Sequence, residues 1–280
     1  MTQKSARAMA EPFPRKIAAT HWATELTQKS FLFKGLDSNK LAECLKEGDF
    51  SLEKLYSSRP IYTAYLPDAP LDHLYVILEG GPVVVRSAPL DRIIALTYAG
   101  GCFGMLDLEL GDRHRYRGFP SLVEAYKTTD ALKISASIIQ KLCHDSEPFQ
   151  LRYSLLFELR EKFQYHLLNC STYPPQAVAA LLRALIYQER TLGHQPQFSK
   201  DKPEKNSGIF CFDLPVDIIA KSCQLNHRTV EQVLKGMTKV GLLKENSKSD
   251  AADLVQVRDP EGMKAVYGAT RDKVDWWPLR

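Results

Sequence analysis

The chain has 280 residues, of which 44% are hydrophobic and 25% are charged, and its formal net charge is +4. This composition allows a sizeable core and excludes a wholly disordered chain, and the length favours two domains. No apolar run reaches the roughly 18 residues that a membrane-spanning helix needs, so we expect no membrane partner.

Six cysteines are scattered without the paired spacing of zinc or iron–sulfur sites, at positions 44, 102, 143, 170, 211 and 223. This spacing argues against a disulfide framework and a metal site, and it favours a reducing, cytoplasmic setting with buried free thiols. Residues 1–30 begin with a basic, polar stretch that lacks the apolar segment of a secretory signal. They predict a flexible N-terminal arm.

After one or two short helices from Phe31, the pattern changes to strands. Strand-like segments separated by turn clusters recur about every ten to twelve residues. They are residues 59–66, 74–78, 83–86, 93–98, 122–126 and 131–134. Because this spacing is too short for crossover helices, it indicates antiparallel pairing and a jelly-roll-like sensory barrel over residues 31–145.

A short helix is predicted over residues 137–144, and a longer one begins near Asp145 and reaches Cys170. On the longer helix, side chains recur at alternating spacings of three and four, as in a coiled-coil seam. These seam residues are Leu156, Leu159, Phe163, His166 and Cys170. A second row, expected to face the barrel, consists of Leu151, Leu155 and Leu159. Two rows imply two partners, the second being the same helix of another subunit; packing within one subunit is the alternative.

The segment Tyr173-Pro174-Pro175 ends this helix, because proline removes a backbone donor and disfavours helix in the residue before it. We place the domain boundary there, so that residues 146–173 form a dimerisation helix and hinge and residues 174–258 a second domain. Within that domain the pattern predicts a helix over residues 176–190 and strands over 208–213 and 254–257. Residues 259–280 are a C-terminal extension with a short helix over 261–267 and a tail, WWPLR, that has no predicted place.

Residues 214–243 have the layout of a helix-turn-helix DNA reader, two short helices joined by a tight turn. The first helix runs from about Pro215 to Cys223, the turn is Gln224-Leu225, and Asn226 caps the second helix. The buried stripe of the second helix is expected to consist of Val230, Val233, Leu234 and Met237.

The outward face of the second helix carries His227, Arg228, Glu231, Gln232 and Lys235, which can donate to bases or phosphates. Between Ile219 and Lys244 there are five lysines and arginines and one glutamate. A clustered excess of this kind attracts phosphate. The alternative is an ordinary helical hairpin with a solvated basic face.

With a barrel, a seam-bearing helix, a hinge and a winged helix-turn-helix in this order, residues 31–258 resemble the CRP/FNR family of bacterial transcription regulators. The matching segments are LYVILEGG at 74–81, GGCFGML at 100–106, and the spacing of Thr229, Val230, Leu234 and Lys235. The FGML stretch is most similar to the NtcA type of cyanobacteria, which responds to 2-oxoglutarate. The resemblance implies an α+β chain that forms a homodimer, reads a palindromic site in double-stranded DNA and contacts RNA polymerase.

The resemblance also bears on the effector. Family members that bind cyclic AMP have a glutamate directly after the Phe-Gly turn and an Arg-Ser or Arg-Thr pair about ten residues later. Here the first place is Met105, and residues 113–121 lack the pair. A thioether cannot accept a ribose hydroxyl's hydrogen bond as a carboxylate does, so cyclic AMP is disfavoured.

A small carboxylate such as 2-oxoglutarate suits the segment better, since backbone N–H groups and an arginine fork can hold it. The expected effector residues are Phe103, Gly104, Met105, Leu106, Arg115 and Arg117. On the long helix, the positions that hold 2-oxoglutarate in its binders correspond to Glu161 and His166, with Arg160 one residue off. The alternative is a barrel that senses no signal.

The expected DNA-binding residues are Asn226, His227, Arg228, Thr229, Gln232 and Lys235. Within this set, Arg228 is expected to read a base and Lys235 to touch phosphate. Gln232 suits adenine, so we predict a half-site less dependent on guanine than that of the cyclic AMP proteins. Gln224 occupies a turn position where the family often has glycine, a difference expected to alter the angle of the second helix.

The leading hypothesis is a homodimeric, sequence-specific transcription regulator. The alternative is a sensory or scaffolding protein whose winged domain binds another protein and not DNA. We do not expect an enzyme, because no nucleophile triad, carboxylate pair or metal-ligand set occurs at useful spacing.

Overall fold

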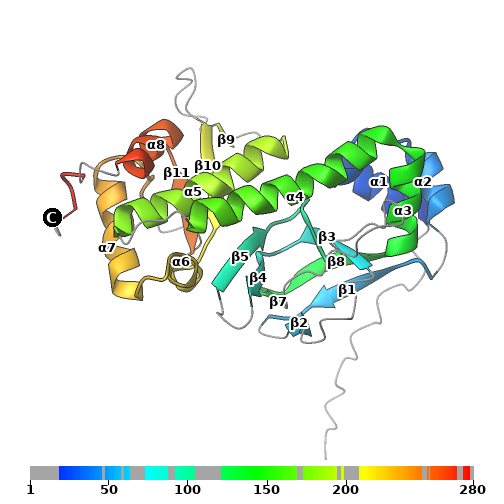
Figure 1. Cartoon of the computed structure of the whole chain (residues 1–280), viewed down its shortest axis with the longest axis horizontal. Coiled ribbons are helices and arrows are strands. Elements are labelled where there is room, and N and C mark those ends of the chain that lie inside the picture. The colour runs from blue at the N-terminus through cyan, green and yellow to red at the C-terminus, as the bar shows by residue number, and fades with distance from the viewer. Residues whose placement is uncertain are drawn as a thin grey trace, which may run out of the picture.

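The computed structural model describes residues 19–45, 48–57, 60–63, 73–87, 92–104, 121–168, 173–193, 197–198, 208–247, 251, 253–269 and 274–277. A β-barrel with helices at one end forms the N-terminal half, and a helical domain with a small sheet forms the C-terminal half (Figure 1). None of the helices in these ranges is long and apolar enough to cross a bilayer.

The N-terminal helices cover one end of the barrel. They are α1 (Ala19–Lys29), a 3-10 turn η1 (Phe31–Phe33) and α2 (Ser38–Cys44). Helix α1 buries Trp22, Ala23 and Leu26 in a cluster that includes Phe33 and Phe149. The prediction of a flexible arm is therefore wrong for residues 19–29, because Trp22 and Leu26 lie one turn apart and give α1 an apolar face.

The barrel consists of two antiparallel four-stranded sheets with strand orders β1-β8-β3-β6 and β2-β7-β4-β5. The strands are β1 (Phe50–Leu55), β2 (Pro60–Thr63), β3 (His73–Glu79), β4 (Val83–Ser87), β5 (Arg92–Thr97), β6 (Cys102–Gly104), β7 (Ser121–Ala125) and β8 (Thr129–Ser135). The predicted jelly-roll-like barrel is confirmed. Strand β6, inside the GGCFGML segment, was not among the predicted strands because it is only three residues long.

Gly104 is required where β6 passes β3. Its φ is +113°, a conformation that L side chains rarely adopt, and a Cβ there would lie 2.5 Å from the carbonyl oxygen of His73. Next to it, Phe103 stacks on Tyr75 with ring centroids 4.8 Å apart. The Phe-Gly pair therefore fixes the pairing of β6 with β3 at the mouth of the barrel.

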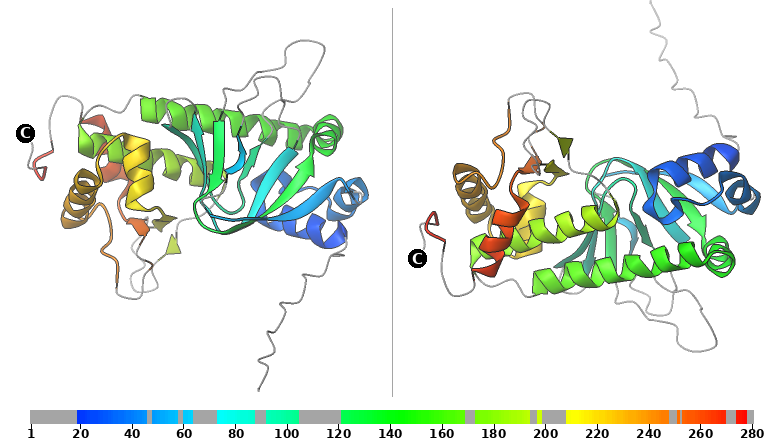
Figure 2. Two further views of the ribbon diagram at one scale, coloured as in Figure 1. Left: turned by 90° about the horizontal axis from the view of Figure 1, so that it is seen from below. Right: turned by 90° about the horizontal axis from the view of Figure 1, so that it is seen from above.

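Three helices follow the barrel: α3 (Ala136–Asp145), α4 (Glu147–Leu168) and α5 (Pro174–Thr191). Helix α4 lies over the barrel, and α5 runs back beside it (Figures 1 and 2). The predicted break is confirmed, since Tyr173 is the N-cap of α5 and Pro174 and Pro175 occupy its first turn, where their missing N–H groups have no helical partner to lose.

The C-terminal half is a winged helix-turn-helix, as predicted. It contains β9 (Gln197–Phe198), β10 (Gly208–Asp213), α6 (Val216–Cys223), α7 (His227–Lys239), β11 (Leu254–Val257) and α8 (Pro260–Gly268). The three strands form an antiparallel sheet in the order β11-β10-β9. One hydrophobic cluster joins α5, α6, α7 and α8 to Val84, Ile93 and Leu96 of the barrel, so the two halves share a core.

Candidate nucleic-acid interface

The turn between α6 and α7 is made without glycine. Gln224 takes the left-handed conformation, with φ 54° and ψ 41°, and it is the one non-glycine residue with positive φ in the described ranges. Backbone N–H groups of Gln224 and Leu225 donate to the carbonyl of Ala220, which closes the first helix. Gln224 therefore adopts the left-handed conformation that glycine adopts without strain, and its backbone is strained as a result.

Asn226 begins the second helix. Its side-chain oxygen accepts the backbone N–H of Thr229 at 2.8 Å, which satisfies one of the unpaired donors of the first turn. Three predicted stripe residues, Val230, Val233 and Met237, are fully buried. Because this stripe points inward, the opposite face of α7 points to solvent.

The predicted DNA-binding residues fall on this outward face. Asn226, His227, Arg228, Gln232 and Lys235 are exposed, and Thr229 is half-buried. Among the described residues, neither Arg228 nor Lys235 has an ion-pair partner. Both cations are therefore available to a ligand.

His227 is held by the first helix. Its Nε2 lies 3.1 Å from Oδ1 of Asp217, and Oδ2 of Asp217 lies 2.9 Å from Nζ of Lys221. The hydrogen bond from Lys221, and then the one from His227, lower the pKa of Asp217. The carboxylate thus ties the start of α7 to α6.

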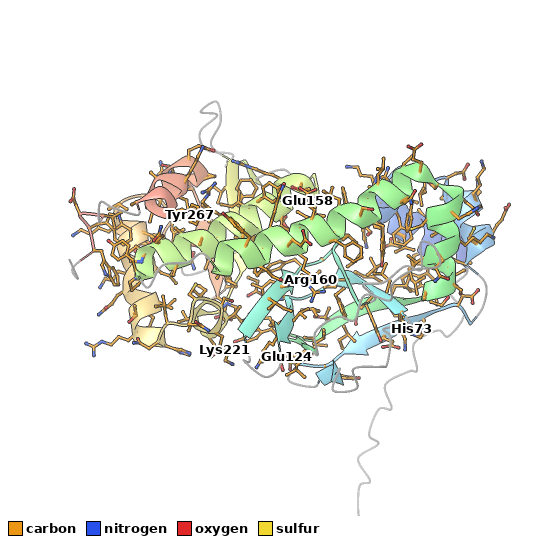
Figure 3. All side chains as sticks on the ribbon, in the orientation of Figure 1. His73, Glu124, Glu158, Arg160, Lys221 and Tyr267 are labelled. Carbon is orange, nitrogen blue, oxygen red and sulfur yellow. The ribbon has the colours of Figure 1, made fainter. Side chains whose placement is uncertain are left out.

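Five exposed cations surround the helix pair. They are Lys221 on α6, Arg228, Lys235 and Lys239 on α7, and Lys244 just before the wing. Figure 3 labels Lys221 on the outer side of α6. One of the five, Lys221, is partly neutralised by Asp217. Arg228, Lys235 and Lys239 are spaced seven and four residues apart and therefore share one face of α7, an arrangement that attracts a phosphate backbone.

A cavity of about 100 Å³ lies between the barrel mouth, α4 and α5. Its walls are mostly apolar, and its polar members include Thr97 of β5, Arg160 of α4 and Gln188 of α5. Gln188 donates to the carbonyl of Leu96 at 3.3 Å. Figure 3 labels Arg160 on the barrel side of α4 and Glu158 on the other side.

The structure brings together part of the predicted effector set. Phe103 and Gly104 line the cavity, whereas Met105, Leu106, Arg115 and Arg117 lie outside the described residues. Arg160, which is one residue away from the position expected to hold the effector, lines the cavity. Glu161, which occupies that position, is exposed. Gln188 was missed because it comes from the second domain, and no local pattern marks α5 as a cavity wall.

The predicted dimer seam needs correction. Leu159 is 8% exposed and Phe163 is 3% exposed in a single chain, so both face their own subunit. Leu156 is half-buried and also lines the cavity. The side chains of His166 and Cys170 lie outside the described residues.

The second predicted row of α4, expected to face the barrel, also differs from the prediction. Leu151, expected to face the barrel, is 65% exposed. The barrel and α5 together cover a wider face of α4 than the barrel alone, and sequence spacing did not reveal that α5 folds back. Leu159 and Phe163 therefore pack within one subunit, the arrangement considered as the alternative, and the face with Leu151 and Tyr165 stays open.

Polar contacts join the barrel to the winged domain. The hydroxyl of Tyr98 donates to the backbone carbonyl of Asp213 at 3.1 Å. Nζ of Lys127 lies 2.7 Å from both carboxylate oxygens of Asp213 and 3.5 Å from Asp253. Hydrogen bonding to Asp213 raises the pKa of Lys127. Since Asp213 precedes α6 by only three residues, these contacts fix the helix pair relative to the barrel.

Metal ligands do not gather in the part of the chain that the structure describes: no three histidine, cysteine, aspartate or glutamate side chains form a site there. None of the described cysteines forms a disulfide, and burial raises the pKa of Cys102 to about 12.

Comparisons with known proteins address the fold. No family model matches the sequence, and no curated protein matches it. Among solved structures, FixK2 from Bradyrhizobium japonicum has a TM-score of 0.54 and 17% identity over 78% of this chain and 96% of that chain. A CooA double mutant from Carboxydothermus hydrogenoformans has a TM-score of 0.53 and 16% identity over 78% and 88%.

A transcriptional regulator of the CRP/FNR family from Eubacterium rectale is similar with a TM-score of 0.48 and 14% identity, over 85% of this chain and 97% of that chain. The structural neighbours are CRP/FNR transcription regulators. The likeness to FixK2 and CooA, each with a TM-score above 0.5, shows that this chain has the fold of that group, a cyclic-nucleotide-binding-like β-roll followed by a C-terminal winged helix-turn-helix domain.

Proposed function

We propose that the protein is a homodimeric, sequence-specific DNA-binding transcription regulator of the cytoplasm. The observation that carries this proposal is the exposed, cationic face of α7, on which Arg228 and Lys235 have no ion-pair partner among the described residues. A helix of this kind enters the major groove, where arginine donates to guanine and glutamine pairs with adenine. In a dimer, two such helices would read half-sites about 34 Å apart and recruit or block RNA polymerase.

The open face of α4 is our candidate for the subunit contact. Leu151 and Tyr165 are 65% and 62% exposed, and they lie on the side of α4 away from the barrel. Burial of two such side chains would remove apolar surface from water in both subunits.

We also propose that the barrel binds a small carboxylate, 2-oxoglutarate being one candidate, and not cyclic AMP. The observation that supports a carboxylate is Arg160, the one arginine among the cavity-lining residues that the structure describes. In this proposal, Arg160 pairs with one of the two carboxylates of 2-oxoglutarate, and the mostly apolar walls enclose its two methylene groups. Calorimetry with 2-oxoglutarate tests the candidate: heat of binding that Arg160→Ala removes supports it, and no heat at millimolar ligand contradicts it.

The salt dependence of DNA binding tests the main proposal. On a DNA site selected by the wild type, Lys235→Ala should lower the slope of log affinity against log salt by about 1, because one phosphate contact is lost. Arg228→Ala should weaken that site by about 1–3 kcal/mol and relax discrimination at one base. Lys141→Ala removes an exposed lysine of α3, far from α7 along the chain, and is the matched control. If all three variants bind as the wild type does, α7 is not the DNA-reading element.

A further inference from the structure

The tail after α8 returns to the helix-turn-helix. Trp277 is 1% exposed and belongs to the same hydrophobic cluster as Val230, Val233 and Met237 of α7. The sequence pattern did not predict where this segment would pack. Figure 1 shows the last coloured segment of the chain beside α7. Residues 274–277 are thus part of the domain that carries the proposed DNA reader.

Trp276 packs against Gly236 in the last turn of α7. A Cβ placed on Gly236 would lie 2.5 Å from Cε3 and 2.6 Å from Cζ3 of the Trp276 ring. Carbon atoms do not approach so closely, so no larger residue fits at this position unless the ring moves. Glycine inside a helix is about 1 kcal/mol less favourable than alanine, and α7 carries this penalty where the ring touches it.

Gly236 lies on the flank of the reading face. It directly follows Lys235 and lies one helical turn after Gln232, both of which are exposed. The Trp276 ring therefore abuts α7 beside the side chains that we expect to touch DNA. Any shift of this ring changes the support on one side of the helix.

The tail is also anchored at the domain boundary. The backbone N–H of Val274 donates to the hydroxyl of Tyr173 at 3.0 Å, and Tyr173 is the N-cap of α5. Two residues later, Trp276 reaches α7. This short segment connects the start of the second domain to the last turn of α7.

We propose that Trp276 is a positioning residue for DNA recognition, and this inference rests on the proposed function. The ring, seated on Gly236 and anchored through Val274, holds α7 at the angle at which Arg228 and Gln232 reach base edges. Trp276 acts through α7. Its loss should weaken base-specific binding and leave the attraction to phosphate intact, because neither Trp276 nor Gly236 is charged.

The test is a double-mutant cycle read as the ratio of specific to non-specific DNA affinity. Trp276→Ala should lower specific affinity about tenfold, as when one base contact is lost, and change non-specific affinity less than about twofold. Gly236→Ala should reproduce this loss because its methyl group displaces the ring. In the Trp276→Ala background, Gly236→Ala should add less than about twofold, since the two changes act through one contact.

Two controls separate positioning from folding. Gly268→Ala also adds a methyl group, but at a glycine with nothing within 4 Å, and it should leave the affinity ratio unchanged. Trp276→Phe keeps an aromatic ring and should restore most of the specific affinity. Thermal melting of each variant reports whether the domain remains folded, which is expected because Trp277 stays in place.

The failure of this inference is distinguishable from the failure of the proposed function. If the full chain selects no DNA site, the proposed function fails, and the role of Trp276 fails with it. If a site is selected and Trp276→Ala keeps the wild-type ratio, or lowers specific and non-specific affinity equally, only the role of Trp276 is overturned.

Discussion

The hydroxyl of Tyr98, the residue directly after β5, donates to the backbone carbonyl of Asp213, the last residue of β10, at 3.1 Å. Burial raises the pKa of Tyr98, so the phenol stays protonated and remains a donor at any physiological pH. Its neighbours Leu96 and Thr97 line the cavity. One strand end therefore touches both the proposed effector site and the segment that leads into α6.

Tyr98→Phe tests this contact. The variant keeps the ring, which packs 6.1 Å from Phe212, but leaves the Asp213 carbonyl without this donor. The hydrogen bond is half-buried, and loss of one such bond costs about 0.5–1.5 kcal/mol, so the free energy of unfolding in urea should fall by that amount. If stability is unchanged, this hydrogen bond does not hold the two halves together.

Gln224→Gly should stabilise the protein. Glutamine at φ 54° carries left-handed strain that glycine does not, and the gain should be about 0.5–1 kcal/mol after the larger entropy loss of glycine. The matched control is Gln232→Gly in the exposed part of α7, which should destabilise by about 1 kcal/mol. Denaturant titration of both variants checks the prediction, and a loss of stability in Gln224→Gly would contradict it.

The lowered pKa of Asp217 predicts how the stability of the protein depends on pH. Because its pKa is lowered from 3.8 in the folded state, its pairing contributes stability above that value, and the contribution disappears as the pH falls through the lowered folded value. The stability difference between wild type and Asp217→Asn should shrink as the pH falls below about 4. A difference that grows as the pH falls below about 4 would show the opposite sign of shift.

Substitutions on the two faces of α4 should behave differently. Phe163→Ala removes a ring that is 3% exposed and should destabilise the chain by about 3–5 kcal/mol. Leu151→Ala removes a side chain that is 65% exposed in the single subunit, so it should change the stability of the monomer, measured at dilution that separates the subunits, by less than about 0.5 kcal/mol. Denaturation of each variant measures both effects.

A charged substitution at Leu151 tests the subunit contact. If the open face of α4 holds the second subunit, Leu151→Asp should shift the protein from dimer to monomer in sedimentation without unfolding it. A dimer that survives this change would place the subunit contact elsewhere.

Local patterns predicted the elements with short-range causes. The Pro174-Pro175 break, the Asn226 cap and the buried stripe of α7 each depend on residues within one or two helical turns. The structure has all three features, except that Leu234 of the predicted stripe is half-buried. The β6 strand and the α1 helix were missed because one is very short and the other follows a polar stretch that dominated the interpretation.

The spacing of residues in the sequence could not predict the packing between distant segments. The spacing of Leu159 and Phe163 marks an apolar face but does not say which partner covers it, and the return of α5 decides that. Gln188 and the Trp276–Gly236 contact are equally non-local, since each joins segments that lie dozens of residues apart. The candidate site could be predicted on α7, where one helix carries it, and only in part around the cavity, where several barrel strands, α4 and α5 meet.

The most direct test of the account is selection of bound sequences from a pool of random duplex DNA by the full chain, beside Arg228→Ala. The account predicts a two-fold symmetric site with half-sites about one helical turn apart and adenine at the position read by Gln232, and it predicts relaxed selection at one base in the variant. A pool in which no symmetric sequence is enriched, or in which both proteins enrich the same site equally, would contradict DNA reading by α7.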